Sequence, residues 1–389
     1  MTRAIVDLDA IGHNTRLLRR AAGGARLMAV VKANGFGHGA VEVAGAALAA
    51  GASWLGVTSP AEAVELRSAG IRAPILMWLY EPDDVPDVPD VDLSVSAVHT
   101  LQSLARVAGR RGRRTAVHLK ADTGLSRAGA TADDWPHLLT VAAKLQAAGL
   151  ITVRGVWSHL ANAEHPDDPG LRRQLIAFGQ ARAAAAAIGF PRPLTHLANS
   201  AATLHLPQAR FDLVRPGIAL YGAEPVPGRT FGLRPAMTLE STVILTKRVG
   251  PGTGVSYGPD HVVTRETTLA LIPAGYADGV PRRVAGRAEV AIHGRRVPIV
   301  GRIAMDQVVA DVGDLPVRAG DRVVLFGPGE RGEPTVAEWA RWAETNPHEI
   351  LTGVGPRVRR CYRGLLAGGS AISTRSPSRP DERAAMTPS

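Results

Sequence analysis

Lysine is scarce in this chain, which makes the surroundings of each lysine informative. Of the 45 basic residues only four are lysines, at positions 32, 120, 144 and 247. Unlike arginine, a lysine can lose its proton and form an imine. Lys32 ends the apolar run LMAVV and precedes the turn-forming residues ANGFGHG, and Lys120 ends the run AVHL. Lys32 is therefore a candidate for Schiff-base chemistry with an aldehyde cofactor, of which pyridoxal phosphate (PLP) is the obvious one.

Further polar side chains lie at the ends of later apolar runs. They are Asp122, His159, Asn199 with Ser200, and Arg215 with Gly217. A PLP enzyme needs a phosphate cradle and a partner for the pyridine nitrogen. Ser200 and the backbone amides of Gly217 and Ile218 could form the cradle. Arg215 could donate to the ring nitrogen, which would leave the ring unprotonated and suit modest carbanion chemistry. Taken alone, Arg215 could instead form an ion pair with Asp212 or another acid.

The elements that must position these residues follow a repeating order. Eight short apolar runs alternate mostly with Ala-rich helical segments. The expected strands cover residues 27–33, 54–59, 73–78, 91–97, 116–122, 153–159, 194–200 and 211–217. Eight such units predict a closed parallel (β/α)8 barrel, with an open doubly wound sheet as the alternative. Barrel enzymes carry their chemistry at the C-terminal ends of the strands, where the polar residues fall.

The pattern changes after about residue 230 to short β-branched runs broken by Gly and Pro. This predicts an α/β protein with a barrel domain over residues 1–230 and a second, all-β domain over residues 231–365. Residues 1–10 could add a strand to the second domain. Residues 366–389 are polar, rich in Pro and Ser and aperiodic, which predicts a disordered tail.

The composition argues against several classes of protein. The formal net charge is +10, and the densest basic run covers residues 106–114. No aromatic residues are interleaved with its arginines to stack bases, so a solvated helix end is favoured over a nucleic-acid site. No stretch approaches the roughly 20 apolar residues that span a bilayer. One cysteine, Cys361, and an N-terminus unlike a secretory signal favour a cytoplasmic location. We expect no nucleic acid, no membrane and no metal site.

The run AVVKANGFGHG (residues 29–39) resembles the PLP-lysine signature of the alanine racemase family. Similar matches follow in order through nearly the whole chain except the tail. They include HLKADTGLSRAG, GVWSHLANAE, LVRPGIALYG, GVSYG, IPAGYADG and IAMDQ. The resemblance implies an isomerase that interconverts L- and D-alanine through a PLP external aldimine and two bases, supplying D-alanine for peptidoglycan. It also implies a homodimer whose active sites are shared between subunits.

The resemblance implies roles for individual residues around the substrate. Lys32 would carry PLP and act as the base for the D-enantiomer. Tyr257 in GVSYG would act on the L-enantiomer, presented from the β domain of the partner subunit. Arg127 would bind the substrate carboxylate. Met305 would contact the substrate across the dimer, and Tyr276 would lie at the entrance.

Other matched positions concern the cofactor. His159 and Arg215 correspond to the pair that tunes the pyridine ring. The residues assigned to binding the rest of the cofactor are Asn199, Ser200, Gly217 and Ile218. Lys120 corresponds to a lysine that is carbamylated in many members, which would convert a cation into an anion able to hold Arg127.

Two positions depart from the family pattern, and two other functions compete with racemisation. Phe36 and Gly353 stand where members place tyrosines that bind the phosphate, which predicts looser PLP retention. A PLP-dependent amino-acid decarboxylase of the same fold is one alternative, although such enzymes place an acid, not Arg215, against the pyridine nitrogen. A non-catalytic PLP-binding protein is the other, although such proteins resemble the barrel alone.

Overall fold

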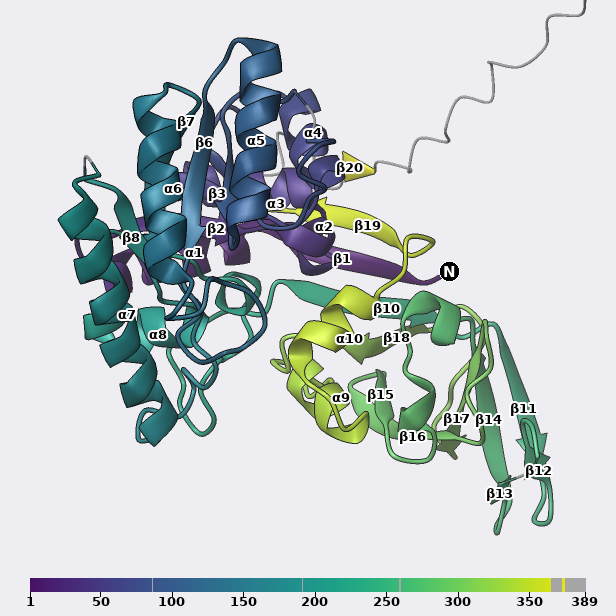
Figure 1. Cartoon of the computed structure of the whole chain (residues 1–389). Helices are drawn as coiled ribbons and strands as arrows, with labels where there is room; N and C mark the ends of the chain where they lie inside the picture. The colour runs from purple at the N-terminus through teal and green to yellow at the C-terminus, as the bar shows by residue number, and fades with distance from the viewer. Residues whose placement is uncertain (86, 191, 259, 365–372, 375–389) are drawn as a thin grey trace, which may run out of the picture. The chain divides into compact units, whose positions relative to one another are not determined.

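The computed structural model describes residues 1–389 except residues 86, 191, 259, 365–372 and 375–389. The chain forms two compact units, Leu8–Ala236 and Met1–Asp7 with Met237–Ser389 (Figure 1). Apart from the strand β20 (Ser373–Thr374), the tail predicted over residues 366–389 lies outside the described residues. Among the described helices, none is both long enough and apolar enough to cross a membrane.

The first unit contains, within its described residues, one sheet of eight parallel strands in the order β8-β7-β6-β5-β4-β3-β2-β9. The strands are β2 (Arg26–Val30), β3 (Trp54–Val57), β4 (Ile75–Met77), β5 (Val91–Val95), β6 (Thr115–Lys120), β7 (Ile151–Trp157), β8 (Leu194–His196) and β9 (Leu213–Val214). Hydrogen bonds between Asp212 and Thr195 join the two ends of the sheet, with N–O distances of 3.0 and 2.7 Å. The predicted parallel barrel is confirmed, and the open doubly wound sheet is excluded.

Most of the eight strands end two to four residues before the expected positions. β2 ends at Val30, β8 at His196 and β9 at Val214. The chain leaves the sheet at these points because the polar side chains that follow cap or brace the next turns. Asn199 accepts a hydrogen bond from Ala202 N (3.1 Å) and so begins helix α8 (Ser200–His205). The candidate residues therefore occupy the loops beyond the strands.

Helices connect most of the strands and surround the barrel (Figure 1). They are α1 (Leu8–Ala22), α2 (Lys32–Phe36), α3 (Ala40–Ala49), α4 (Pro60–Ser68), α5 (Val98–Arg111), α6 (Trp135–Ala147), α7 (Pro169–Ile188) and α8, with the 3-10 turns η1 (Pro207–Ala209) and η2 (Ile218–Tyr221). Helix α5 ends within the basic run of residues 106–114, where Gly112 adopts a left-handed conformation (φ 61°).

The second unit is built on a sheet with the order β11-β14-β17-β16-β15-β18-β10-β1-β19-β20. Its strands are β1 (Arg3–Asp7), β10 (Met237–Thr242), β11 (Leu245–Val249), β14 (Thr267–Ile272), β15 (Glu289–Ile292), β16 (Arg295–Val300), β17 (Val308–Gly313), β18 (Arg322–Phe326), β19 (Arg359–Arg363) and β20. β1 pairs antiparallel with β10 and parallel with β19. A separate hairpin joins β12 (Gly254–Val255) to β13 (His261–Val262).

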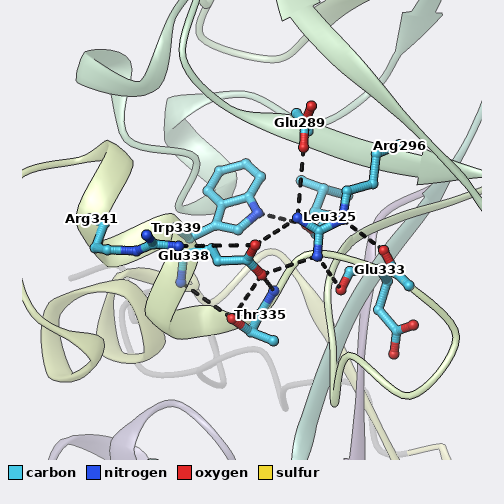
Figure 2. A network of polar contacts seen from close by, with 9 residues as sticks. Glu289, Arg296, Leu325, Glu333, Thr335, Glu338, Trp339 and Arg341 are labelled. Carbon is cyan, nitrogen blue, oxygen red and sulfur yellow. Dashed lines mark hydrogen bonds and ion pairs between the residues drawn. The ribbon is translucent and has the colours of Figure 1, made fainter. Parts of the chain in front are cut away.

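This unit is mostly β rather than all-β, because it also contains the short helices α9 (Val336–Trp342) and α10 (Pro347–Gly353), with the 3-10 turns η3 (Tyr276–Asp278) and η4 (Arg282–Val284). Thr335 and Glu338 form a capping box that begins α9. Figure 2 shows how α9 is fastened to the sheet: Arg296 donates to Glu338 (2.6 Å), and Trp339 Nε1 donates to Leu325 O (2.6 Å). This helix was not predicted from the sequence because a capping box is a short, local signal that is hard to recognise among β-branched runs.

Candidate functional site

Lys32 lies just beyond β2, at the C-terminal end of the barrel strands. The next four residues, 33–36, all adopt positive φ angles between 50° and 59°, although only one of them is glycine. Three non-glycine residues in this region store strain. Glu62 Oε1 accepts from Ala33 N (2.7 Å) and Asn34 Oδ1 accepts from Ala40 N (3.0 Å), so side chains hold the turn in place. The turn therefore presents Lys32 in a fixed position.

The surroundings of Lys32 favour its neutral amine. Burial is the main cause that lowers the pKa of Lys32, and the positive charge of Arg127 adds to the shift. The carboxylate of Glu62 opposes it. The Nζ atom also lies 5.8 Å from the ring centroid of Trp78. The neutral amine is the form that attacks a carbonyl carbon. A lowered pKa therefore suits Lys32 to imine formation.

Arg127 lies in a tight loop that follows β6. Ala130 N donates to Lys120 O (2.9 Å) and Asp122 N donates to Ala130 O (2.8 Å), so the loop folds back on its own start. The Asp122 carboxylate accepts hydrogen bonds from two further backbone amides of the loop, those of Gly124 and Ser126. Gly129 has a φ of 121°, and a Cβ atom there would lie 2.5 Å from Asp122 N. The loop therefore carries exposed Arg127 on a rigid base.

Lys120 ends β6 and is buried, unlike a typical surface lysine. Burial lowers its pKa to about 8, assisted by the charges of Arg127 and Arg215 and opposed by Asp122. Its Nζ lies 4.6 Å from the ring centroid of Trp157. A minority of this amine is therefore already neutral near physiological pH, and the neutral share grows as the pH rises through about 8.

Arg215 is 4% exposed and lies just past β9. Its Nη2 donates to Ser158 O (2.7 Å) and Leu197 O (3.2 Å), and its Nη1 donates to His196 Nδ1 (2.9 Å). The Asp212 carboxylate instead accepts from Thr195 N. Among the described residues Arg215 forms no ion pair with Asp212 or another acid, so this alternative from the sequence is wrong.

His159 follows β7 and lies beside Arg215, with 3.5 Å between Nδ1 and Nη2. Burial lowers its pKa to about 3, and the charges of Arg215, Arg127 and the two nearby lysines contribute. The imidazole is therefore neutral at physiological pH. These electrostatic effects show that the sequence-predicted residues from four strand ends share one cationic neighbourhood.

A small cradle of backbone amides forms beyond β8 and β9. Ser200 Oγ accepts from Gly217 N (2.9 Å) and Ala219 N (3.3 Å). A Cβ atom at Gly217 would lie 3.0 Å from Cζ of Phe36, so glycine leaves the space between them open. The Phe36 ring is stacked on Tyr221, with centroids 4.6 Å apart. Ser200, Gly217 and the start of η2 at Ile218 could thus hold a phosphate.

Tyr257, Tyr276 and Met305 belong to the second unit. Their exposed fractions are 68%, 44% and 53%, which is high for large apolar side chains. Tyr276 N donates to Ala304 O (3.1 Å) and Ala277 N to Met305 O (3.0 Å), so two of the three share one loop cluster. Ser256 Oγ donates to Arg302 O (2.7 Å), which fastens the turn carrying Tyr257 to the neighbouring loop.

Three buried ionisable residues within the barrel strands were not predicted from the sequence. Asp92 lies in β5, His118 in β6 and His196 in β8, and each is fully buried. The candidate residues stand at the ends of the expected strands, whereas these three residues lie inside those strands. A polar residue inside an apolar run was the signal that could have found them, as in VDLSV and AVHLK.

Comparisons with known proteins agree with this architecture. Models of the alanine racemase N-terminal and C-terminal domains match residues 6–225 and 236–362. An alanine racemase of Thermobifida fusca is 51% identical over 93% of this chain and 98% of its own length. The crystal structure of alanine racemase from D-cycloserine-producing Streptomyces lavendulae has a TM-score of 0.90 and 48% identity, covering 93% of this chain and 97% of that one. Alanine racemase from Bartonella henselae, solved with covalently bound pyridoxal phosphate, has a TM-score of 0.83 and 29% identity, covering 93% and 99%.

Proposed function

Because this chain belongs to the alanine racemase family, we propose that it interconverts L- and D-alanine with PLP joined to Lys32. The observation that carries the proposal is the Lys32 amine, held in a strained turn at the barrel mouth with a lowered pKa. When bound, PLP supplies an aldehyde for an amine and an electron sink for the charge that develops at Cα.

The residues beyond the strands fit the proposed cofactor. The amides around Gly217 would bind the phosphate together with Ser200, and Asn199 supports them by capping α8. Arg215 would donate to the ring nitrogen and, because arginine keeps its proton, would leave that nitrogen unprotonated. Neutral His159 would lie beside it without adding a second positive charge.

The substrate carboxylate would bind Arg127, which projects from the loop after β6, a loop braced by its own hydrogen bonds. Racemisation requires that one base remove the Cα proton on one face and that another return a proton on the other. Lys32 would serve the D-enantiomer. Tyr257 would serve the L-enantiomer from a second copy of the chain, with Met305 contacting the substrate and Tyr276 at the entrance. The exposure of these three side chains supports a homodimer, since exposed apolar groups mark interaction surfaces.

Incubation of the purified protein with PLP and L-alanine, followed by chiral chromatography, tests the activity. We expect a steady approach to equal amounts of both enantiomers with the total alanine unchanged. A fall in total alanine would favour the decarboxylase instead. Unchanged L-alanine would overturn the racemase proposal and favour a non-catalytic PLP-binding protein.

We also propose that the protein is cytoplasmic and supplies D-alanine for peptidoglycan, as the single cysteine and the family relationship favour. Expression in a bacterial strain that requires external D-alanine should restore growth without it. Expression of Lys32→Ala in the same strain should not, and growth with that variant would contradict the assignment.

Phe36→Tyr is expected to tighten PLP binding by about fivefold. The ring carbon that would carry the new hydroxyl lies close to Gly217, and one added hydrogen bond to phosphate contributes about 1 kcal/mol. Equilibrium dialysis of PLP from the two proteins gives the dissociation constants. Tyr221→Phe, which loses the hydrogen bond to Val30 O (2.9 Å), controls for general changes in ring packing. Weaker PLP binding by Phe36→Tyr would show that the hydroxyl does not fit.

Lys120 is expected to carry a carbamate that increases as the pH rises through about 8, because CO2 reacts only with a neutral amine. The resulting anion would pair with Arg127. Carbon-13 NMR after exchange into labelled bicarbonate should show one carbamate signal that disappears in Lys120→Ala and persists in Lys144→Ala. A spectrum without this signal at mildly alkaline pH would contradict the carbamate.

A further inference from the structure

A continuous line of polar side chains crosses the interior of the barrel. It consists of Arg154 in β7, Asp92 in β5, His118 in β6, His196 in β8 and Arg215 beyond β9. The four hydrogen bonds that join them are 2.8 to 2.9 Å long. Barrel interiors are usually filled by branched apolar side chains, and burying ionic groups there costs free energy. A line of this kind therefore calls for an explanation beyond stability.

The Arg215 end of the line determines where every proton lies. A guanidinium can only donate, so His196 Nδ1 must accept from Arg215. His196 is then neutral with its proton on Nε2, which donates to His118 Nδ1. His118 is therefore also neutral, and its own Nε2 proton points to the carboxylate of Asp92. All of these hydrogen bonds point the same way, from Arg215 towards Asp92.

The barrel is shaped around this line. A Cβ atom at Gly155 would lie 2.1 Å from His118 Nδ1, so only glycine leaves room for the ring. The Trp157 ring is stacked on His196 with centroids 5.5 Å apart and an interplanar angle of 8°. The rings of Trp54 and His118 form a T-shaped pair with centroids 5.6 Å apart. Burial and the charge of Arg215 also hold the pKa of His196 well below its usual range, which keeps that ring neutral.

At the far end of the line the Asp92 carboxylate has a second partner. Arg154 donates from Nη1 to Asp92 Oδ1 (2.9 Å), and its own side chain is 38% exposed. Both residues line a cavity of about 220 Å³. Asp92 thus accepts from His118 on one side and from a partly hydrated arginine on the other, so the negative charge at this end is paired.

We propose that Asp92, His118 and His196 are positioning residues that hold the Arg215 guanidinium in one orientation and polarise it towards the cofactor ring. This inference rests on the proposed function. His196 Nδ1 and the carbonyls of Ser158 and Leu197 together give the guanidinium three acceptors, which fix its plane. Each hydrogen bond in the line strengthens the next, so the charge of Asp92 is felt at Arg215 although the two do not touch.

Nitrogen-15 NMR of the PLP-loaded wild-type enzyme, labelled at histidine, tests the proton placement directly. His118→Gln and His196→Gln assign the two ring signals. We expect both rings to be neutral with the proton on Nε2 throughout the neutral and mildly alkaline range. A charged ring, or a proton on Nδ1 of either residue, would overturn the proposal. This readout does not depend on alanine, so it remains valid even if the wild type fails to racemise it.

Asp92→Asn tests the effect on the reaction, with Asp212→Asn as the matched control. Asp212 is another barrel carboxylate with a backbone amide partner, but it lies outside the line. We expect Asp92→Asn to lower kcat by about tenfold and to shift the visible absorption of bound PLP, while KM for alanine changes less than about twofold. The control should match wild type in all three. Equal kcat and absorption in the two variants would overturn the proposal. If Asp92→Asn does not fold, the wild-type NMR spectrum decides.

Discussion

Lys32→Ala is expected to lower kcat for alanine racemisation by about four orders of magnitude, because under the proposed mechanism the variant would lose both the covalent attachment of PLP and one of the two bases. The strained turn from residue 33 to 36 presents one amine at the barrel mouth. Among the described residues the buried lysine is Lys120, which ends a different strand from the one before the half-buried Lys32. Chiral chromatography measures the activity, and mass spectrometry after borohydride reduction locates the PLP.

Lys144→Ala is the matched control, since Lys144 is exposed on α6 and should be dispensable. It should retain both the activity and the labelled peptide that contains Lys32. The assignment would be contradicted if, in the reduced wild-type enzyme, Lys32 were unmodified and PLP were attached to another residue. Substantial racemisation by Lys32→Ala would do the same.

Tyr257→Phe is expected to lower racemisation in both directions by about a thousandfold, within the range that a positioned acid or base contributes. The loss should be directional when each half of the reaction is followed separately. In deuterium oxide the variant should no longer exchange the α-proton of L-alanine, whereas Lys32 should still exchange that of D-alanine. Proton NMR measures both rates in the same sample. Equal loss of exchange for the two enantiomers would contradict the assigned roles.

Mixing the two inactive variants tests whether the active sites are shared between subunits. If the sites are shared, a hybrid dimer of Lys32→Ala and Tyr257→Phe would have one site with both mutations and one site with neither. After subunit exchange, half of the dimers are hybrids with one intact site, so about a quarter of wild-type activity should return. No recovery, with hybrids demonstrated by native mass spectrometry, would indicate that Lys32 and Tyr257 act within one chain.

The barrel was predictable from the sequence because each strand is a short apolar run and each helix has its own local pattern. The strand ends were less predictable. At positions 197–200 the run LANS still reads as strand, and only the capping bond from Ala202 N to Asn199 shows that the chain has already turned. Lys32 was identified by its scarcity and its position, but nothing in ANGF indicates that non-glycine residues adopt positive φ angles.

The line through the barrel interior could not have been predicted from the sequence. Alternation along β6 places His118 and Lys120 on the same face, which the sequence does indicate. The partners of His118 come from β5 and β8, 26 and 78 residues away, so the pairing exists only after the barrel closes. The absence of a side chain at Gly155 is equally decisive, and a single sequence offers no reason for that glycine.

The position of β1 has a consequence for how the protein is made. The ribosome synthesises β1 before the entire barrel, yet its neighbours β10 and β19 follow only after it, with Asp7 opposite Arg363. The barrel unit is continuous in sequence and can fold while synthesis proceeds. β1 therefore stays unpaired along both edges until β10 and β19 have been synthesised. During that interval it is open to mispairing and to proteases, so nascent chains should depend on chaperones more than the finished protein does.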